Sequence, residues 1–166
     1  MNGRILRTIL LVALLPLGLW GWRVLHPSQE HLIQKALAGL ARTACVPANE
    51  AQLSKLANAQ KVASFFATDA EINVDLPGRF SQTINGRDEI QEKALGARAI
   101  LNGFTVEFVD VGVTVSPDGQ SAVARLTAKA NFPGDSVPQV EELKINFKKV
   151  EGDWLIQHAE NVKTLH

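Results

Sequence analysis

Apolar residues recur along this chain with two different spacings, and each spacing predicts a different kind of element. Intervals of three and four residues place side chains on one face of a helix, and after the capping residue Ser28 they relate Ile33, Ala36, Leu37 and Leu40. A second helix is predicted after Asn49, which forms a capping box with Gln52, and its apolar face comprises Leu53, Leu56, Ala59, Ala63 and Phe66. A third helix is predicted from Asp88 to Gly103.

Strict alternation of apolar and polar residues predicts strands, first from Ala70 to Leu76 and then over most of the chain after Phe104. After Phe108 the apolar positions change from even to odd numbers, which indicates a β-bulge because one extra residue flips every later side chain. Further strands are predicted at 121–132, 139–150 and 154–162. Since the helices come first and the antiparallel strands last, the fold class is α+β, with one bent antiparallel sheet wrapped around the N-terminal helices.

The last two strands form a hairpin whose loop is either Glu151-Gly152 or Gly152-Asp153. In both registers, even-numbered residues of the last strand share a face with odd-numbered residues of the strand before it. This predicts one apolar face, beneath the helices, that contains Ile145, Phe147, Trp154, Ile156, His158 and Glu160. These six residues are the candidate lining of a ligand pocket.

His158 and Glu160 are the candidate reactive groups of this face, and two interpretations stay open. Residues two apart on a strand are about 6.6 Å apart, close enough to share a water molecule or a ligand. They either line a pocket, as a base or as hydrogen-bond partners, or are buried polar residues satisfied by backbone groups, by Arg79, by Arg98 or by each other. No metal site is expected, because the other histidines have no ligand spacing to His158.

Composition narrows the choice of partners. The chain of 166 residues has 17 basic and 17 acidic residues, so no overall field attracts nucleic acid, and we expect no nucleic-acid partner. The single cysteine, Cys45, excludes an internal disulfide and is expected to be a small buried residue. Glycine-rich phosphate loops and nucleophile elbows are missing from the sequence, so we expect no cofactor.

The first 27 residues predict a membrane anchor. The stretch from Thr8 to Trp22 has no charge and covers about 22 Å of a hydrocarbon layer about 30 Å thick, and interfacial arginine and tryptophan side chains extend that reach. A cleaved signal is the alternative, although no small-residue cleavage site follows. Arg4 and Arg7 precede the stretch, so we expect the N-terminus in the cytoplasm and the rest of the chain outside the cell (inner) membrane, in the periplasm or extracellular space.

The residues after this segment divide into a connecting helix at 28–48 and a domain at 49–166. This domain resembles the nuclear transport factor two-like superfamily, which includes SnoaL-like and ketosteroid-isomerase-like proteins. The resemblance rests on Gly86-Arg87-Asp88-Glu89-Ile90 and on the hairpin Gly152-Asp153-Trp154-Leu155-Ile156. It implies a cystatin-like cone, often with an apolar pocket and often dimeric through the sheet. The family's isomerases and dehydratases rely on pocket tyrosines, and this chain has none.

The sequence therefore leaves three functions open. The first is a membrane-anchored, non-enzymatic domain that binds a small apolar ligand or a protein partner, with a homodimer through the sheet as one such partner. The second is an isomerase, dehydratase or hydrolase in which His158 is the general base, oriented by Glu160. The third is a structural or assembly domain without a pocket.

Overall fold

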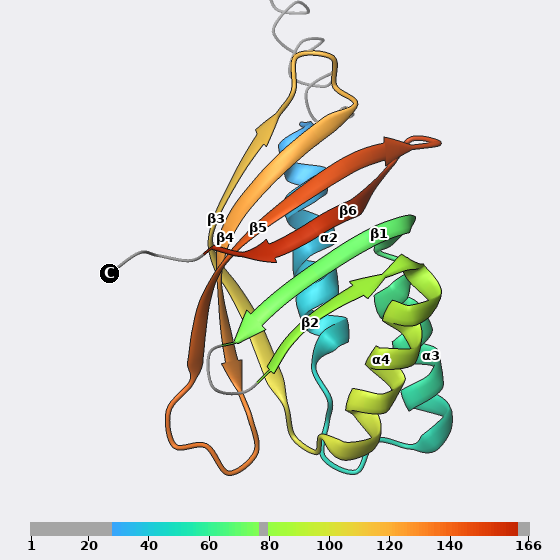
Figure 1. The fold of residues 1–166 in the computed structure, drawn as a ribbon, viewed down its shortest axis with the longest axis vertical. Helices are drawn as coiled ribbons and strands as arrows, with labels where there is room; N and C mark the ends of the chain where they lie inside the picture. The colour runs from blue at the N-terminus through green and yellow to red at the C-terminus, as the bar shows by residue number, and fades with distance from the viewer. Residues whose placement is uncertain (1–27, 77–79, 163–166) are drawn as a thin grey trace, which may run out of the picture.

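The computed structural model describes residues 28–76 and 80–162, and its elements confirm the α+β class (Figure 1). The helices are α2 (Gln29–Ala44), α3 (Gln52–Ala63) and α4 (Gly86–Ile100). The strands are β1 (Phe66–Leu76), β2 (Phe80–Asn85), β3 (Thr105–Val115), β4 (Ser121–Asn131), β5 (Gln139–Val150) and β6 (Asp153–Asn161). The sequence missed β2, whose residues were predicted as a polar loop.

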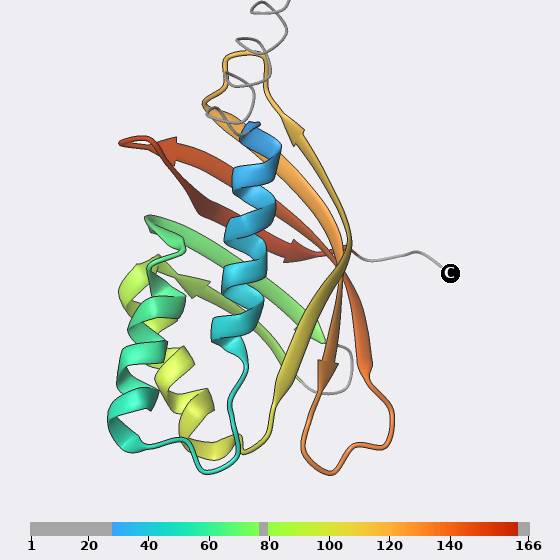
Figure 2. The same ribbon diagram turned by 180° about the vertical axis from the view of Figure 1, so that it is seen from behind.

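One curved sheet holds all six strands in the order β2-β1-β6-β5-β4-β3. Neighbouring strands are antiparallel except for β1 and β6, which run parallel. Helix α2 crosses one face of the sheet, and α3 and α4 lie side by side next to β1 and β2 (Figures 1 and 2). We call the face beneath the helices the inner face and the opposite one the outer face.

The bulge predicted in β3 is confirmed. The register between β3 and β4 shifts between Val109 and Gly112, and Asp110 has a φ of 53°. Ahead of the bulge Phe108 packs against the core, and behind it Val111, Val113 and Val115 do so. The extra residue bends the strand and keeps apolar side chains on the inner face along its whole length.

A second bulge, in β6, was not predicted. Phe147 pairs with Ile156, but its neighbour Asn146 pairs with His158, so Gln157 is the extra residue. From this point on the odd-numbered residues of β6 face inward: Ala159, which pairs with Ile145, packs against the core. The prediction that His158 and Glu160 share the apolar face is therefore wrong, because it assumed a regular β5–β6 ladder and that ladder is interrupted at Gln157, directly before His158.

The helix caps match the sequence only in part. Ser28 is the N-cap of α2, as predicted, and its Oγ accepts a hydrogen bond from the His31 amide at 3.3 Å. Asn49 does not cap α3, because it adopts a left-handed conformation with a φ of 60° outside the helix. Helix α4 begins two residues before Asp88, at Gly86, where Glu89 accepts a hydrogen bond from the amide of the N-cap residue Asn85.

The core lies between α2 and the inner face of the sheet. Helix α2 contributes Ile33, Leu37 and Leu40, as its spacing predicts, and the sheet contributes Phe66, Leu126, Ile145, Phe147 and Ile156. In α3 the predicted apolar face is only partly buried: Ala59 and Ala63 pack inward, whereas Leu53 and Leu56 are exposed. Cys45, just after α2, is half-buried, with its Sγ 3.4 Å from the Val106 amide nitrogen.

A buried ion pair joins the three helices at the end of the molecule where α2 stops. The Arg98 guanidinium of α4 donates hydrogen bonds to both carboxylate oxygens of Glu50, at 2.7 and 3.0 Å. It also donates to the carbonyl oxygens of Thr43 and Cys45, at the C-terminal end of α2, where backbone carbonyls have no helical partner. Asn58 of α3 donates to the same Glu50 carboxylate at 2.6 Å, so each of the three helices among the described residues is linked to this pair.

The anchor predicted at 1–27 lies outside the described residues. Within residues 28–162, excepting 77–79, no helix combines the length and apolar character needed to cross a membrane.

Candidate functional site

A groove of about 410 Å³ opens between α2, the start of β1 and the tip of the β5–β6 hairpin. One wall is the side of α2 that carries Leu32, Lys35 and Ala36. The opposite wall is the stretch 152–155 of the hairpin, and the floor is formed by Ser64 and Phe65, where α3 turns into β1. The volume is within the range of small-molecule sites, and most of the lining side chains on α2 and at Phe65 are apolar.

The position of Trp154 in this groove is fixed by polar contacts. Its indole Nε1–H donates a hydrogen bond to Gln29 Oε1 at 3.0 Å, and the Lys149 ammonium donates to the same oxygen at 2.9 Å. That ammonium also lies over the indole ring, 5.6 Å from its centroid. Because the only polar atom of the indole is satisfied, the ring can pack as an apolar group, and only 7 % of Trp154 is exposed.

The residues predicted to line a pocket are separated by the structure. Trp154 lines the groove and is also a buried member of the core, whereas Ile145, Phe147 and Ile156 are each 2 % exposed and belong to the packed core alone. His158 and Glu160 lie on the outer face, so they do not meet Trp154 across a shared cavity. Arg98, which was a predicted partner of theirs, is bound to Glu50 instead.

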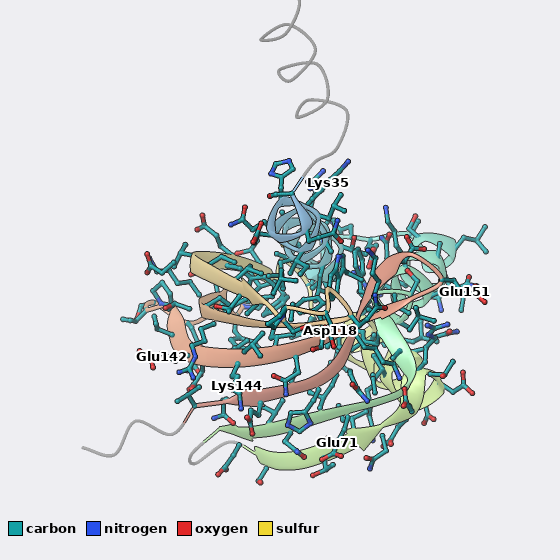
Figure 3. All side chains as sticks on the ribbon, turned by 90° about the horizontal axis from the view of Figure 1, so that it is seen from above. Lys35, Glu71, Asp118, Glu142, Lys144 and Glu151 are labelled. Carbon is teal, nitrogen blue, oxygen red and sulfur yellow. The ribbon has the colours of Figure 1, made fainter. Side chains whose placement is uncertain are left out.

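On the outer face, His158 and Glu160 belong to a polar cluster. Glu160 accepts a hydrogen bond from the Lys144 ammonium at 3.0 Å, and its other oxygen lies 3.5 Å from His158 Nε2. The hydrogen bond from Lys144 holds the pKa of Glu160 below its ordinary value, against the opposing effect of partial burial, and His158 adds to the lowering. Figure 3 shows Lys144 and Glu71 on the side of the sheet opposite to α2 and Lys35.

The sequence did not identify Leu32, Ala36 and Phe65 as members of one site. Leu32 and Ala36 are one helical turn apart, beside the core stripe of α2, and this widening of the apolar face was the available signal. Phe65 is half-buried against the core, and its role in the groove follows from the turn between α3 and β1. Among residues 28–76 and 80–162, no group of three or more histidine, cysteine or carboxylate side chains is placed to hold a metal ion.

A comparison with known protein families finds no match, and none of the curated proteins matches the sequence. Several solved structures do share the fold. A protein with a cystatin-like fold from Nostoc punctiforme is 11 % identical, with a TM-score of 0.60 over 80 % of this chain and 88 % of that chain. A nuclear transport factor two-like protein with a cystatin-like fold from Novosphingobium aromaticivorans is 18 % identical, with a TM-score of 0.59 over 80 % and 79 %.

A nuclear transport factor two-like protein of unknown function from Pseudomonas putida is 10 % identical, with a TM-score of 0.62 over 85 % of this chain and 92 % of that chain. At such identities the likeness shows the fold alone. The cystatin-like cone that the sequence resemblance implied is thereby confirmed. Activity depends on the site residues, since this scaffold hosts unrelated functions.

Proposed function

We propose that this chain, whose fold is that of nuclear transport factor two-like proteins, is a membrane-anchored binding domain that lies outside the cytoplasm and holds a small apolar ligand in the groove beside Trp154. The groove carries this proposal. Its walls at Leu32, Ala36 and Phe65 are only half-buried although they are apolar, so a ligand placed there removes their remaining surface from water.

The packed core favours the groove over the interior of the cone. Ile33, Leu37, Phe147 and Ile156 meet there with exposures of 2 % or less, so the centre of the cone is occupied by side chains. A ligand that entered the interior would have to displace these side chains and break close packing, at the cost that such repacking carries. A ligand in the groove displaces only water.

The alternative function, with His158 as a general base, has less support. The His158 imidazole and the Glu160 carboxylate are 3.5 Å apart, which suits a base and its orienting group, but both lie on the outer face. Glu160 is also engaged by Lys144. Neither side chain is among those that line the groove, so a ligand bound beside Trp154 would be out of their reach.

Binding to the groove can be tested with the neutral fluorescent probe N-phenylnaphthylamine and the purified full chain in mild detergent. The probe is excited directly, so that the signal does not depend on the number of tryptophans in each variant. Ala36→Trp fills the groove from α2, and Ala38→Trp, which adds the same side chain at an exposed position of the same helix, is the matched control. We expect Ala36→Trp to weaken binding at least tenfold and Ala38→Trp to leave it unchanged. Equal binding by both variants would place the probe elsewhere.

The anchor is tested on the same full-length chain by fractionation and by protease treatment of intact cells. We expect the chain to remain with the membrane after alkaline extraction, and residues 28–162 to become cleavable only when the compartment outside the inner membrane is opened. A shorter form in the soluble fraction would show that the first residues are a cleaved signal.

A second copy of this chain is the protein partner that we propose for the outer face. On the outer face Glu71 lies on β1 and Arg125 on β4, whereas Lys144 and Lys148 of β5 already pair with Glu160 and Asp69. Two copies stacked in opposite directions would bring the two charge types together. Sedimentation velocity at low and high salt tests this: we expect a dimer that dissociates as salt rises, and a monomer at both salts would exclude it.

A further inference from the structure

The edge of β6 is open where it borders the groove. Strand β1 pairs with β6 only from Ile156 onward, where the Ile156 amide donates to the Phe65 carbonyl at 2.9 Å. Before Phe65 the chain turns away into α3, which ends at Ala63. The hairpin therefore extends past the start of β1 (Figure 1), and within the described residues no strand pairs with the first β6 residues on that side.

The backbone groups of Trp154 point to this unpaired side of β6. Lys149, which is opposite Trp154, directs its amide to the other side, where it donates to the Gln120 carbonyl at 2.8 Å. The Lys149–Trp154 pair is thus not hydrogen-bonded, and Trp154 directs its N–H and C=O away from β5, as Ile156 does. Neither group has a hydrogen-bond partner within the described part of the chain.

The charge beside this open edge is positive. Lys35 lines the groove, and its ammonium forms no ion pair with any residue in 28–76 or 80–162. Asp153 also borders the groove, but side chains alternate along β6, so its carboxylate is on the face opposite to Trp154. A ligand bound against Trp154 on the α2 side therefore meets Lys35, and it does not meet Asp153.

We propose that the groove recognises an N-acylated α-amino acid with a free carboxylate, a proposal that rests on the ligand-binding function above. The ligand amide N–H donates to the Trp154 carbonyl, and one carboxylate oxygen accepts from the Trp154 amide, as one residue of an added strand would do. The other carboxylate oxygen accepts from Lys35, and the acyl chain lies against Leu32, Ala36 and Phe65. This ligand would form hydrogen bonds with the Trp154 backbone and an ion pair with the Lys35 ammonium. It would also cover the apolar wall of the groove.

Two sources supply this chemistry: a fatty-acylated amino acid, and the C-terminal residue of a peptide. The probes are N-decanoylalanine for the first and acetyl-trileucine with a free carboxylate for the second. Each is measured by displacement of N-phenylnaphthylamine from the full chain. Tighter binding of the first identifies an acylated amino acid as the source, and tighter binding of the second identifies a peptide end.

Two matched analogues test the recognised groups one at a time. The ester formed from decanoic acid and lactic acid keeps the carboxylate but lacks the amide N–H, which leaves the Trp154 carbonyl without a donor. N-decanoylalaninamide keeps the N–H but lacks the negative charge. We expect each to bind about tenfold more weakly than N-decanoylalanine, the usual effect of one lost hydrogen bond or ion pair in a partly dry site.

Lys35→Gln tests the charge from the side of the protein, with Lys93→Gln, an exposed lysine of α4, as the control. We expect Lys35→Gln to abolish the preference for N-decanoylalanine over its carboxamide and Lys93→Gln to retain that preference in full. Hydrogen exchange provides a second measurement. The Trp154 amide should exchange rapidly in the free chain and slow at least tenfold with N-decanoylalanine, while the Ile156 amide is slow in both.

The outcomes separate the two proposals. If the neutral probe itself does not bind, or binds the Ala36→Trp variant equally well, the ligand-binding function is wrong. If the probe binds the groove but the ester and the carboxamide bind as tightly as N-decanoylalanine, the function stands and the recognition of an acylated amino acid is wrong. An unprotected Trp154 amide in the saturated complex would also overturn it.

Discussion

Removal of the Glu50 carboxylate should destabilise the fold more than any exposed substitution in the same region. Arg98 and Glu50 have side-chain exposures of 2 % and 3 %, so a guanidinium left without its carboxylate stays in a nearly dry environment. Loss of one partner of a buried ion pair costs about 3–5 kcal/mol, and the Asn58 amide loses its acceptor as well. We therefore expect Glu50→Ala to lower the free energy of unfolding by at least about 3 kcal/mol, which corresponds to a fall in Tm of about 10 °C.

The assay is urea unfolding of the full chain, followed by circular dichroism, with the detergent kept constant. Leu53→Ala is the control, because Leu53 lies in the first turn of α3 with 82 % of its surface exposed and should cost less than about 0.5 kcal/mol. The double variant Glu50→Leu/Arg98→Leu, which removes both charges, should be more stable than Glu50→Ala. A cost below about 1 kcal/mol for Glu50→Ala would refute the reasoning, since it would mean that the Thr43 and Cys45 carbonyls alone satisfy Arg98.

Three further results are expected. His158→Ala should leave binding of N-phenylnaphthylamine within twofold of the unmodified chain by fluorescence titration, because His158 is on the outer face; a large loss would favour the catalytic alternative. Glu160→Gln should lower Tm at pH 7, and the deficit should shrink as the pH falls below the ordinary pKa of a glutamate: the lowered pKa of Glu160 stabilises the fold at higher pH, and this contribution is lost as the pH falls through the lowered value, so a deficit that does not change with pH would contradict it. Ile156→Ala should cost about 2–5 kcal/mol in urea unfolding, whereas a cost near zero would mean that the core can close around the lost volume.

The two bulges show how far the sequence can predict this sheet. In β3, valines and phenylalanines alternate on both sides of Asp110, so the change of parity is visible in the sequence. In β6, the same event is marked only by Ala159, a small residue that replaces His158 on the inner face. The register predicted from the hairpin turn assumes an unbroken ladder. It is therefore correct for Trp154 and Ile156, and it is wrong for the residues after Gln157.

The groove was beyond prediction for a different reason. It exists because the first pairing of β1 with β6 is between Phe66 and Ile156, so that residues 152–155 of the hairpin extend past the start of β1. Such an offset between strands distant in the sequence depends on how α3 and α4 pack beside the sheet, and no local pattern encodes it. The Arg98–Glu50 pair is similar: each residue occupies an ordinary surface-like position in its helix or loop pattern, and only the tertiary arrangement buries them.

Gln157 divides β6 into two parts. Before Gln157, Trp154 and Ile156 face the core and the groove; after it, His158 and Glu160 lie on the outer face. Because Gln157 is the extra residue, its deletion would restore a regular ladder and leave His158 and Glu160 on the outer face and Ala159 on the inner face, without altering the hairpin turn. The outer surface can thus change through substitutions after Gln157 while the residues of the groove, which precede Gln157, stay the same, so the two surfaces are free to diverge independently.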